Sequence, residues 1–272
     1  MAGLTLPPYL AERSQWISDA DPHPDGDFVL YWAHHALRAH DNPALDAAAN
    51  LALQLGKPLL VYQGLGGRHR YNSDRHHRFI LEAARDFSDE LSSAGQRLVF
   101  HLPEDPAQPG PLTQLLERCA AVVSELYPVP PFRQWYRRHA EKHASLPWLL
   151  VDASCILPMP LSDKAPTRAF RFRNAWREDI DGRVSKGYAA VTEWPEAFDG
   201  DVGFEPFDLS EPLSGAIARC RIDHSSPAVS DTPGGSVAGY ERWNRFLDSS
   251  LDRYDRLRND AALPQGVSRM SA

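Results

Sequence analysis

Four residues near the C-terminus have side chains that could hold a phosphorylated ligand. Ser268, Arg269 and Ser271 offer two hydroxyls and a guanidinium, and Tyr254 precedes them on a segment with helical spacing. Hydroxyls and backbone N–H groups suit a diphosphate, and an arginine adds charge-assisted hydrogen bonds. The simpler interpretation is a tyrosine on a helix face followed by a frayed terminus, and the residue types alone favour it.

A second group of polar residues follows the first apolar run of the chain, at residues 28–32. Arg38, Asp41 and Asn42 lie in the loop after this run. Open α/β sheets bind ligands outside the carboxyl ends of their strands, so this loop is a candidate ligand site. Capping of the next helix would also explain the aspartate and the asparagine. Glu125 ends another apolar run and is a candidate polar group in the same crevice.

Other kinds of chemistry find less support in the sequence. Five histidines are the most conspicuous remaining candidates: His34, His35, His40, His76 and His77. Their spacing matches no set of metal ligands, and no cysteine or carboxylate completes one. The glycines of residues 64–67 do not form a GxGxxG motif and indicate a turn. No serine–histidine–acid or cysteine–histidine arrangement stands out, and Trp32, Trp135 and Trp148 are interpreted as core or sheet-end aromatics.

The elements that must position these residues follow from the apolar pattern. Five short runs are rich in valine, leucine and aromatics, as buried parallel strands are; they cover residues 28–32, 57–65, 97–102, 120–127 and 148–154. Four helical patterns alternate with them, at residues 41–56, 75–95, 110–120 and 132–144. This alternation predicts an α/β domain over residues 27–154, with a doubly wound, five-stranded, mostly parallel Rossmann-like sheet.

The flanking segments differ from this domain. Residues 1–26 are rich in proline and aspartate and predict a loose tail, and residues 155–235 predict a long, proline-rich linker with one or two short helices. Such a linker normally crosses a surface that needs covering, which could belong to another domain. Residues 234–260 then predict one amphipathic helix. Its apolar stripe consists of Val237, Tyr240, Trp243, Leu247, Leu251 and Tyr254. Because this stripe has no evident partner, we expect self-association.

Composition narrows the class of protein. The net charge of −7 over 272 residues argues against a dedicated nucleic-acid-binding module, which usually carries a basic face. Three widely spaced cysteines, Cys119, Cys155 and Cys220, favour a reducing compartment. No apolar run approaches the length of a membrane span, and the N-terminus lacks the pattern of a signal peptide. We therefore expect a cytoplasmic protein.

Four segments together resemble the DNA photolyase/cryptochrome family. They are VLYWAHHALRAHDNPALDAA (29–48), VVSELYPVPPFRQW (122–135), DASCILPMPLSDK (152–164) and the C-terminal GGSVAGYERWNRFLDSSLDRYDRLRND with VSRMS (234–260 and 267–271). They occur in the family's order, and the form VLYW is similar to the class II branch. Three positions depart from the family pattern: Glu125 replaces an aspartate, Pro130 an arginine and Val267 a threonine.

The resemblance implies an N-terminal antenna domain, its linker, and a truncated start of the flavin-binding helical domain at 236–272. It implies a carbon–carbon lyase in which reduced FAD, excited by light, passes an electron to a cyclobutane pyrimidine dimer in DNA. The residues implied for FAD are Tyr254, Val267, Ser268, Arg269, Met270 and Ser271. An antenna chromophore, a deazaflavin or a folate, would lie near Arg38, Asp41 and Asn42. No catalytic residue is implied, since the family's catalytic half is absent from this sequence.

Two other functions stay open on these residues. A cryptochrome-like blue-light sensor shares the architecture but performs no repair, and nothing in this sequence separates the two. A non-catalytic pigment- or nucleotide-binding α/β module would instead be self-contained, without the long linker and the amphipathic helix. Damaged DNA and a separately encoded flavin domain are the partners that the first function would require.

Overall fold

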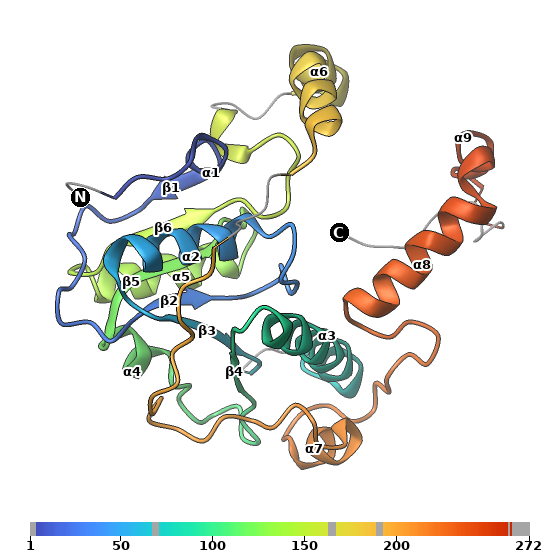
Figure 1. Ribbon diagram of the computed structural model, residues 1–272. Helices are drawn as coiled ribbons and strands as arrows, with labels where there is room; N and C mark the ends of the chain where they lie inside the picture. The colour runs from blue at the N-terminus through green and yellow to red at the C-terminus, as the bar shows by residue number, and fades with distance from the viewer. Residues whose placement is uncertain (1–3, 67–70, 163–166, 189–192, 261, 263–272) are drawn as a thin grey trace. The chain divides into compact units, whose positions relative to one another are not determined.

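The computed structural model describes residues 4–66, 71–162, 167–188, 193–260 and 262 (Figure 1). The chain forms two compact units. The first, called the α/β unit, comprises residues 1–64, 90–102 and 109–207, and the second unit comprises residues 65–89, 103–108 and 208–272.

The α/β unit contains a six-stranded sheet in the order β1-β6-β5-β2-β3-β4. The strands are β1 (Ser14–Trp16), β2 (Phe28–Trp32), β3 (Leu59–Gly64), β4 (Leu98–His101), β5 (Cys119–Glu125) and β6 (Trp148–Val151). Strands β2 to β6 pair in parallel, and β1 pairs antiparallel with β6. The predicted fold class and its five parallel strands are confirmed, and the structure adds one strand.

The additional strand lies in the segment for which the sequence predicts a loose tail. Helix α1 (Pro8–Ala11) precedes it, and residues 14–16 pair with residues 149–151 of β6. Arg13 fixes this pairing, because its guanidinium donates to the carbonyl oxygens of Asp152 at 2.9 Å and Tyr9 at 3.2 Å. A strand of three residues is too short to show an alternating pattern, which explains why the sequence did not reveal it.

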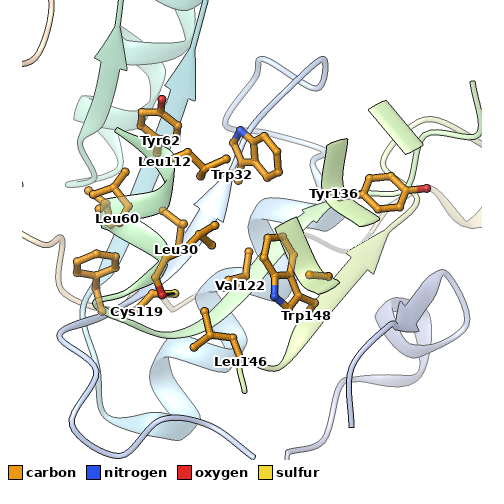
Figure 2. Close-up of a cluster of buried hydrophobic side chains, with 14 of the residues drawn as sticks. Leu30, Trp32, Leu60, Tyr62, Leu112, Cys119, Val122, Tyr136, Leu146 and Trp148 are labelled. Atoms are coloured by element: carbon orange, nitrogen blue, oxygen red, sulfur yellow. Dashed lines mark hydrogen bonds between the residues drawn. The ribbon is translucent and has the colours of Figure 1, made fainter. Parts of the chain in front are cut away.

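Helices cover both faces of the sheet. Helix α2 (Pro43–Leu55) packs against β2, β5 and β6 through an alanine-rich face, and Gly56 ends it in a left-handed conformation. Helices α4 (Leu112–Leu116) and α5 (Phe132–Lys142) pack on the opposite face. There the even-numbered residues of β2 join Leu60, Val122 and Trp148 in one buried cluster (Figure 2). The helices predicted at 41–56, 110–120 and 132–144 are present in this unit, with bounds shifted by a few residues, and the helix predicted at 75–95 is α3 (Asp74–Ser93), which lies mostly in the second unit.

Part of the predicted linker belongs to the α/β unit itself. The backbone N–H of Leu59 donates to Glu196, and that of Phe198 donates to Leu59, at 2.8 and 2.9 Å. The ring of Phe198 lies 4.8 Å from that of Phe28. Residues 193–207 therefore cover the sheet of the unit that precedes them in sequence. Two further elements of this segment, η1 (Met159–Leu161) and the 18-residue helix α6 (Ala169–Lys186), belong to the same unit.

The second unit is helical. It contains α7 (Leu213–Arg219), α8 (Ser236–Ser249), η2 (Leu251–Arg253) and α9 (Tyr254–Leu257), and it shares α3 (Asp74–Ser93) with the α/β unit. Within it, Arg85 donates to the carbonyl oxygens of Leu209 and Glu211, at 2.8 and 2.9 Å. Asp86 accepts from the backbone N–H of Val237 at 2.9 Å, so a carboxylate of α3 satisfies the first turn of α8.

The structure differs from the predicted single helix over residues 234–260 at one point. Helix α8 ends at Ser249, and Ser250 has a non-helical backbone with φ −137°. The hydroxyl of Ser249 donates to the carbonyl oxygen of Arg245, and serine hydroxyls that bind backbone groups compete with helical hydrogen bonds. The apolar periodicity continues through this break, which is why the sequence pattern did not show it.

The apolar stripe of α8, η2 and α9 is exposed. Its residues retain between 38% and 61% of their accessible surface: Val237, Tyr240, Trp243, Leu247, Leu251 and Tyr254. Contiguous exposed apolar residues of this kind favour association with another surface. We expect the chain to self-associate through this stripe.

The substitution Leu247→Glu tests this expectation, because it places a charge in the centre of the stripe. In sedimentation velocity, the wild-type chain is expected to show a sedimentation coefficient that rises with concentration, and the variant to sediment as a monomer. Arg245→Gln changes the net charge by the same amount at an exposed position of α8 outside the stripe and is expected to behave as wild type. A wild-type chain that stays monomeric at all concentrations would contradict the expectation.

Candidate functional site

The strand order reverses between β2 and β5. Strand β2 lies at the centre of the sheet, with β3 and β4 on one side and β5 and β6 on the other. The chain leaves the carboxyl ends of β2 and β5 toward opposite sides, and open α/β sheets bind ligands in the crevice at this point. The loop of residues 33–42 follows β2 there, and Glu125 is the last residue of β5.

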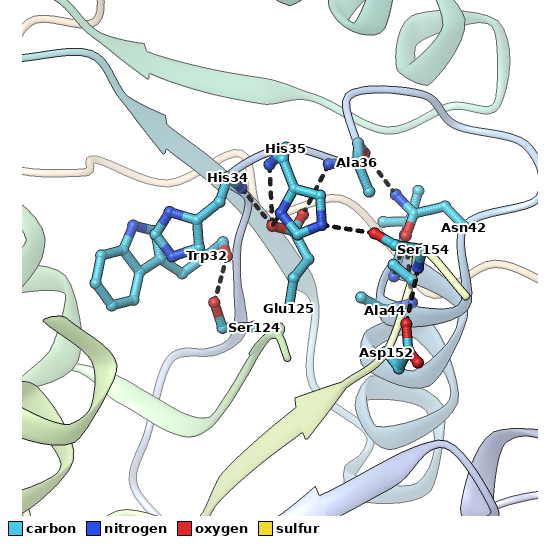
Figure 3. Close-up of polar contacts among 12 residues, drawn as sticks. Trp32, His34, His35, Ala36, Asn42, Ala44, Ser124, Glu125, Asp152 and Ser154 are labelled. Carbon is cyan, nitrogen blue, oxygen red and sulfur yellow. Dashed lines mark hydrogen bonds and ion pairs between the residues drawn. The ribbon is translucent and has the colours of Figure 1, made fainter. Parts of the chain in front are cut away.

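Glu125 organises this loop. Its carboxylate is fully buried and accepts the backbone N–H groups of His34 at 2.9 Å and His35 at 3.0 Å on one oxygen (Figure 3). The other oxygen accepts the hydroxyl of Tyr31 at 2.7 Å and, at 3.4 Å, the N–H of Ala36. The loop is therefore folded around a carboxylate, and these N–H groups are not available to a phosphate.

The same contacts set the charge of the site. Burial acts to raise the pKa of Glu125, but contact with His35 and the hydrogen bond from Tyr31 outweigh it and hold the pKa at about 2. The Nδ1 atom of His35 lies 3.1 Å from the carboxylate. Burial lowers the pKa of His34 to about 4, and burial together with Glu125 raises the pKa of Tyr31. At neutral pH the site holds a carboxylate, a neutral His34 and a neutral phenol.

The three residues predicted in this loop have different environments. The amide of Asn42 is fully buried; its oxygen accepts the N–H groups of Ala44 and Leu45, and its nitrogen donates to the carbonyl oxygens of Ala36 and Arg38. This residue thus caps α2 and closes the loop.

Arg38 and Asp41 lie nearer the solvent. The guanidinium of Arg38 donates to the carbonyl oxygens of Asp41 at 2.9 Å and Ala153 at 3.1 Å, which ties the loop to the end of β6. Asp41 is exposed and has φ +47°, a left-handed conformation that is uncommon for a residue with a side chain. Of the three, Asp41 is exposed, Arg38 is half-buried and Asn42 is fully buried.

Two aromatic residues that the sequence analysis did not single out, Tyr127 and Phe132, border the loop. The ring of Tyr127 lies 4.3 Å from that of His35 and 5.2 Å from that of Phe132. Phe132 in turn lies 5.2 Å from Trp135, which is 38% exposed. The signal available in the sequence was the position of these residues directly after β5. Together the rings form an aromatic surface at the carboxyl edge of the sheet, suited to a planar ligand.

No serine–histidine–acid arrangement stands out in the sequence, but the structure brings Ser154, His35 and Glu125 together. The Nε2 atom of His35 lies 2.9 Å from the hydroxyl oxygen of Ser154, and its Nδ1 atom faces Glu125. An acyl-transfer site also needs donors for the oxyanion. The N–H groups of Ser154 and Cys155 both donate to Asp152, at 2.9 and 3.0 Å, and do not serve that purpose. The arrangement connects the loop to the end of β6.

The C-terminal candidates are described only in part. Tyr254 begins α9, where its ring packs edge-on against Phe246 at 5.8 Å and the Arg258 guanidinium lies 5.7 Å from it. Residues Val267, Ser268, Arg269, Met270 and Ser271 lie outside the described residues.

The histidines, cysteines and carboxylates of the described residues include no group of three that could hold a metal ion. In the same residues, no helix combines the length and apolar character needed to span a bilayer.

The substitution Glu125→Gln tests the role of the buried carboxylate. It leaves the donors of the loop without a charged acceptor, and we expect a loss of about 2–4 kcal/mol in the free energy of unfolding. Glu141→Gln, an exposed position on α5, is the matched control and is expected to stay within about 0.5 kcal/mol of wild type. Urea unfolding at neutral pH measures both.

The pH dependence of unfolding gives a second measurement. Glu125 has a lowered pKa in the fold, so its stabilisation is complete above its ordinary pKa of 4.5 and is lost as pH falls toward about 2. His34 also has a lowered pKa, and therefore costs stability as pH falls from 6.5 toward about 4. Glu125→Gln is expected to abolish the lower of these two ranges and to extend the upper one to lower pH, because the charge of Glu125 raises the pKa of His34. An unchanged acid profile in the variant would contradict this assignment.

The comparisons with known proteins cover most of the chain. A family model described as DNA photolyase matches residues 29–190. The deoxyribodipyrimidine photo-lyase of Methanothermobacter thermautotrophicus is 26% identical over 257 residues, which cover 92% of this chain and 54% of that protein.

Solved structures agree in fold. A class III photolyase from Agrobacterium tumefaciens has a TM-score of 0.56 at 18% identity, covering 90% of this chain and 49% of that one. A Synechocystis cryptochrome has a TM-score of 0.53 at 18% identity, covering 85% and 49%. The chain thus spans about half the length of the relatives that it matches. Because the family model covers more than half of the chain, this chain belongs to the DNA photolyase family.

Proposed function

We propose that this chain is the antenna portion of a deoxyribodipyrimidine photolyase, which repairs cyclobutane pyrimidine dimers in DNA with light and reduced FAD. The observation that carries the proposal is the Glu125-centred loop at the switch point of the sheet, inside the segment that matches the family. A fixed loop at this position is what a ligand-binding α/β domain requires. The class II branch stays a prediction from the VLYW motif.

The chemistry of the loop favours a planar chromophore over a phosphate. The backbone N–H groups of His34, His35 and Ala36 already bind Glu125, while the rings of His35, Tyr127 and Phe132 form an aromatic surface beside them. A deazaflavin or a folate would stack on such rings. Arg38 and Asp41 are the proposed polar contacts of this antenna, and Asn42 holds the loop in place.

FAD is proposed to bind mainly through the half of the family's length that this chain does not span. Tyr254 and residues 267–271, from Val267 through Ser268, Arg269 and Met270 to Ser271, would contribute to its diphosphate, as the family resemblance implies. Reduced FAD would supply the electron that splits the dimer. A deoxyribodipyrimidine photo-lyase as a relative over nearly the whole chain supports this proposal.

Titration with a chromophore tests the antenna site. We expect the purified chain to bind a deazaflavin or a folate, followed through the quenching of tryptophan fluorescence. Tyr127→Ala is expected to weaken that binding roughly tenfold, since a stacked aromatic contact is worth about 1–3 kcal/mol. Tyr71→Ala, an exposed tyrosine of the second unit, is the control and is expected to bind as wild type. Equal affinity in all three proteins would contradict the assignment.

Co-expression tests the activity. The chain is expressed alone and together with the C-terminal half of the Methanothermobacter relative, and the absorption of each product is recorded. Flavin bands are expected only on co-expression, with dimer cleavage in irradiated DNA under blue light. Flavin without dimer cleavage would instead indicate a cryptochrome-like sensor. Absence of flavin in both preparations would remove the proposed enzyme function from this chain.

A further inference from the structure

Helix α6 carries a cluster of arginines that make few contacts with the rest of the fold. Its segment RAFRFRNAWR (168–177) contains four arginines, three aromatic residues and no carboxylate, in a chain of net charge −7. Arg168 stands at the N-cap of the helix, and Arg171, Arg173 and Arg177 follow in its first half. All four are exposed, and α6 has no buried residue.

These arginines differ in their partners from Arg118 and Arg183 of the same unit. The guanidinium of Arg118 binds Asp27, and that of Arg183 binds Glu12 at 2.8 Å, so both connect distant segments. Within the described residues, Arg168, Arg171 and Arg173 have no side-chain hydrogen bond or ion pair. Arg177 approaches only Asp181, at 3.8 Å and with both side chains about three-quarters exposed. These four arginines therefore contribute little to the stability of the fold.

The placement of these charges does not serve the helix either. Cations near the N-terminus of a helix oppose the helix dipole, and acidic residues are the ones that stabilise a first turn. The first turn of α6 contains no acidic residue, and no side chain caps it. A local departure from the rules of stability at an exposed, charged position is expected where a residue serves recognition.

From the exposed charge of these residues, we propose that Arg168, Arg171 and Arg173 contact the phosphate backbone of DNA, with Arg171 and Arg173 on opposite sides of the helix, because residues two apart do not share a face. Arginine is the preferred residue for phosphate, and aromatic side chains between cations are typical of nucleic-acid surfaces. The four arginines extend over about 14 Å of helix at 1.5 Å per residue, a length over which duplex DNA presents about eight negative charges. DNA as the partner rests on the proposed repair function; the surface is the new assignment.

Helix α6 is poorly suited to binding a membrane. Insertion into a lipid surface requires a continuous apolar face along the helix. The exposed large apolar residues of α6 are Phe170 and Val184, which stand at its two ends. An acidic protein would match the charge, but the proposed repair function gives DNA as the partner.

The salt dependence of DNA binding tests the proposal. A fluorescent duplex of undamaged DNA is titrated with the full chain in the dark, without flavin, between about 20 and 200 mM salt. The triple variant Arg168→Gln/Arg171→Gln/Arg173→Gln is expected to bind at least tenfold more weakly at the lowest salt. Its slope of log affinity against log salt is expected to fall by about 2–3, since each phosphate contact contributes about 0.9.

A charge-matched control separates a surface from a change in net charge. The control variant is Arg137→Gln/Arg138→Gln/Lys142→Gln, which removes three exposed positive charges from α5. Its slope of log affinity against log salt is expected to stay within about 0.5 of the wild-type slope. Unchanged thermal midpoints and circular dichroism check the fold of both variants. Equal loss in the two variants, or no binding by the wild-type chain, would overturn the proposal.

Two further titrations decide between classes of partner. If the α6 variant loses binding to polyglutamate or to anionic vesicles as strongly as it loses DNA, the surface is not specific for nucleic acid and the proposal fails. Because these measurements use neither light nor flavin, their outcome is independent of the co-expression experiment. The α6 variant is also expected to leave the flavin bands of the co-expressed protein unchanged.

Discussion

The buried carboxylate of Glu125 is the constraint on which the switch-point loop depends. A charge at the centre of an α/β sheet is costly unless hydrogen-bond donors surround it, and the loop supplies them from the backbone of residues 34–36 while Tyr31 supplies a hydroxyl. The conformation of the loop and the ionisation of Glu125 therefore depend on the same hydrogen bonds. A neutral side chain at this position would remove the reason for the loop to fold as it does.

This constraint extends into the elements on both sides of the loop. Asn42 closes the loop and begins α2 with the same amide group, so the start of the helix is fixed by the loop and not only by its own sequence. Where the family resemblance expects an aspartate, this chain has glutamate, whose additional methylene lengthens the reach of the carboxylate. With that reach the carboxylate contacts both Tyr31 on the neighbouring strand β2 and the backbone that follows β2.

The sequence predicted the elements that have an apolar pattern and missed those that depend on single contacts. The parallel strands of the α/β unit appear as continuous apolar runs and its helices as periodic patterns. Strand β1, in contrast, has three residues and depends on Arg13, whose partners come from residues 152 and 155. Glu125 was identified only as a lone carboxylate, because its donors are backbone groups that no sequence pattern shows. Tyr127 and His35 meet across about ninety residues of sequence for the same reason. Contacts made by the backbone or across the fold are not visible in local periodicity.

Net charge illustrates the same limit at the level of the whole chain. A value of −7 argues against nucleic-acid binding only if the charges are evenly distributed, and in this chain they are not. Arginines such as Arg13, Arg118 and Arg183 bind carbonyls and carboxylates within the α/β unit, where their charge is neutralised or shielded. The arginines in the first half of α6 have no such partners, so their field extends into solvent. Since steering depends on the local potential within about a Debye length, an acidic protein can present a basic surface.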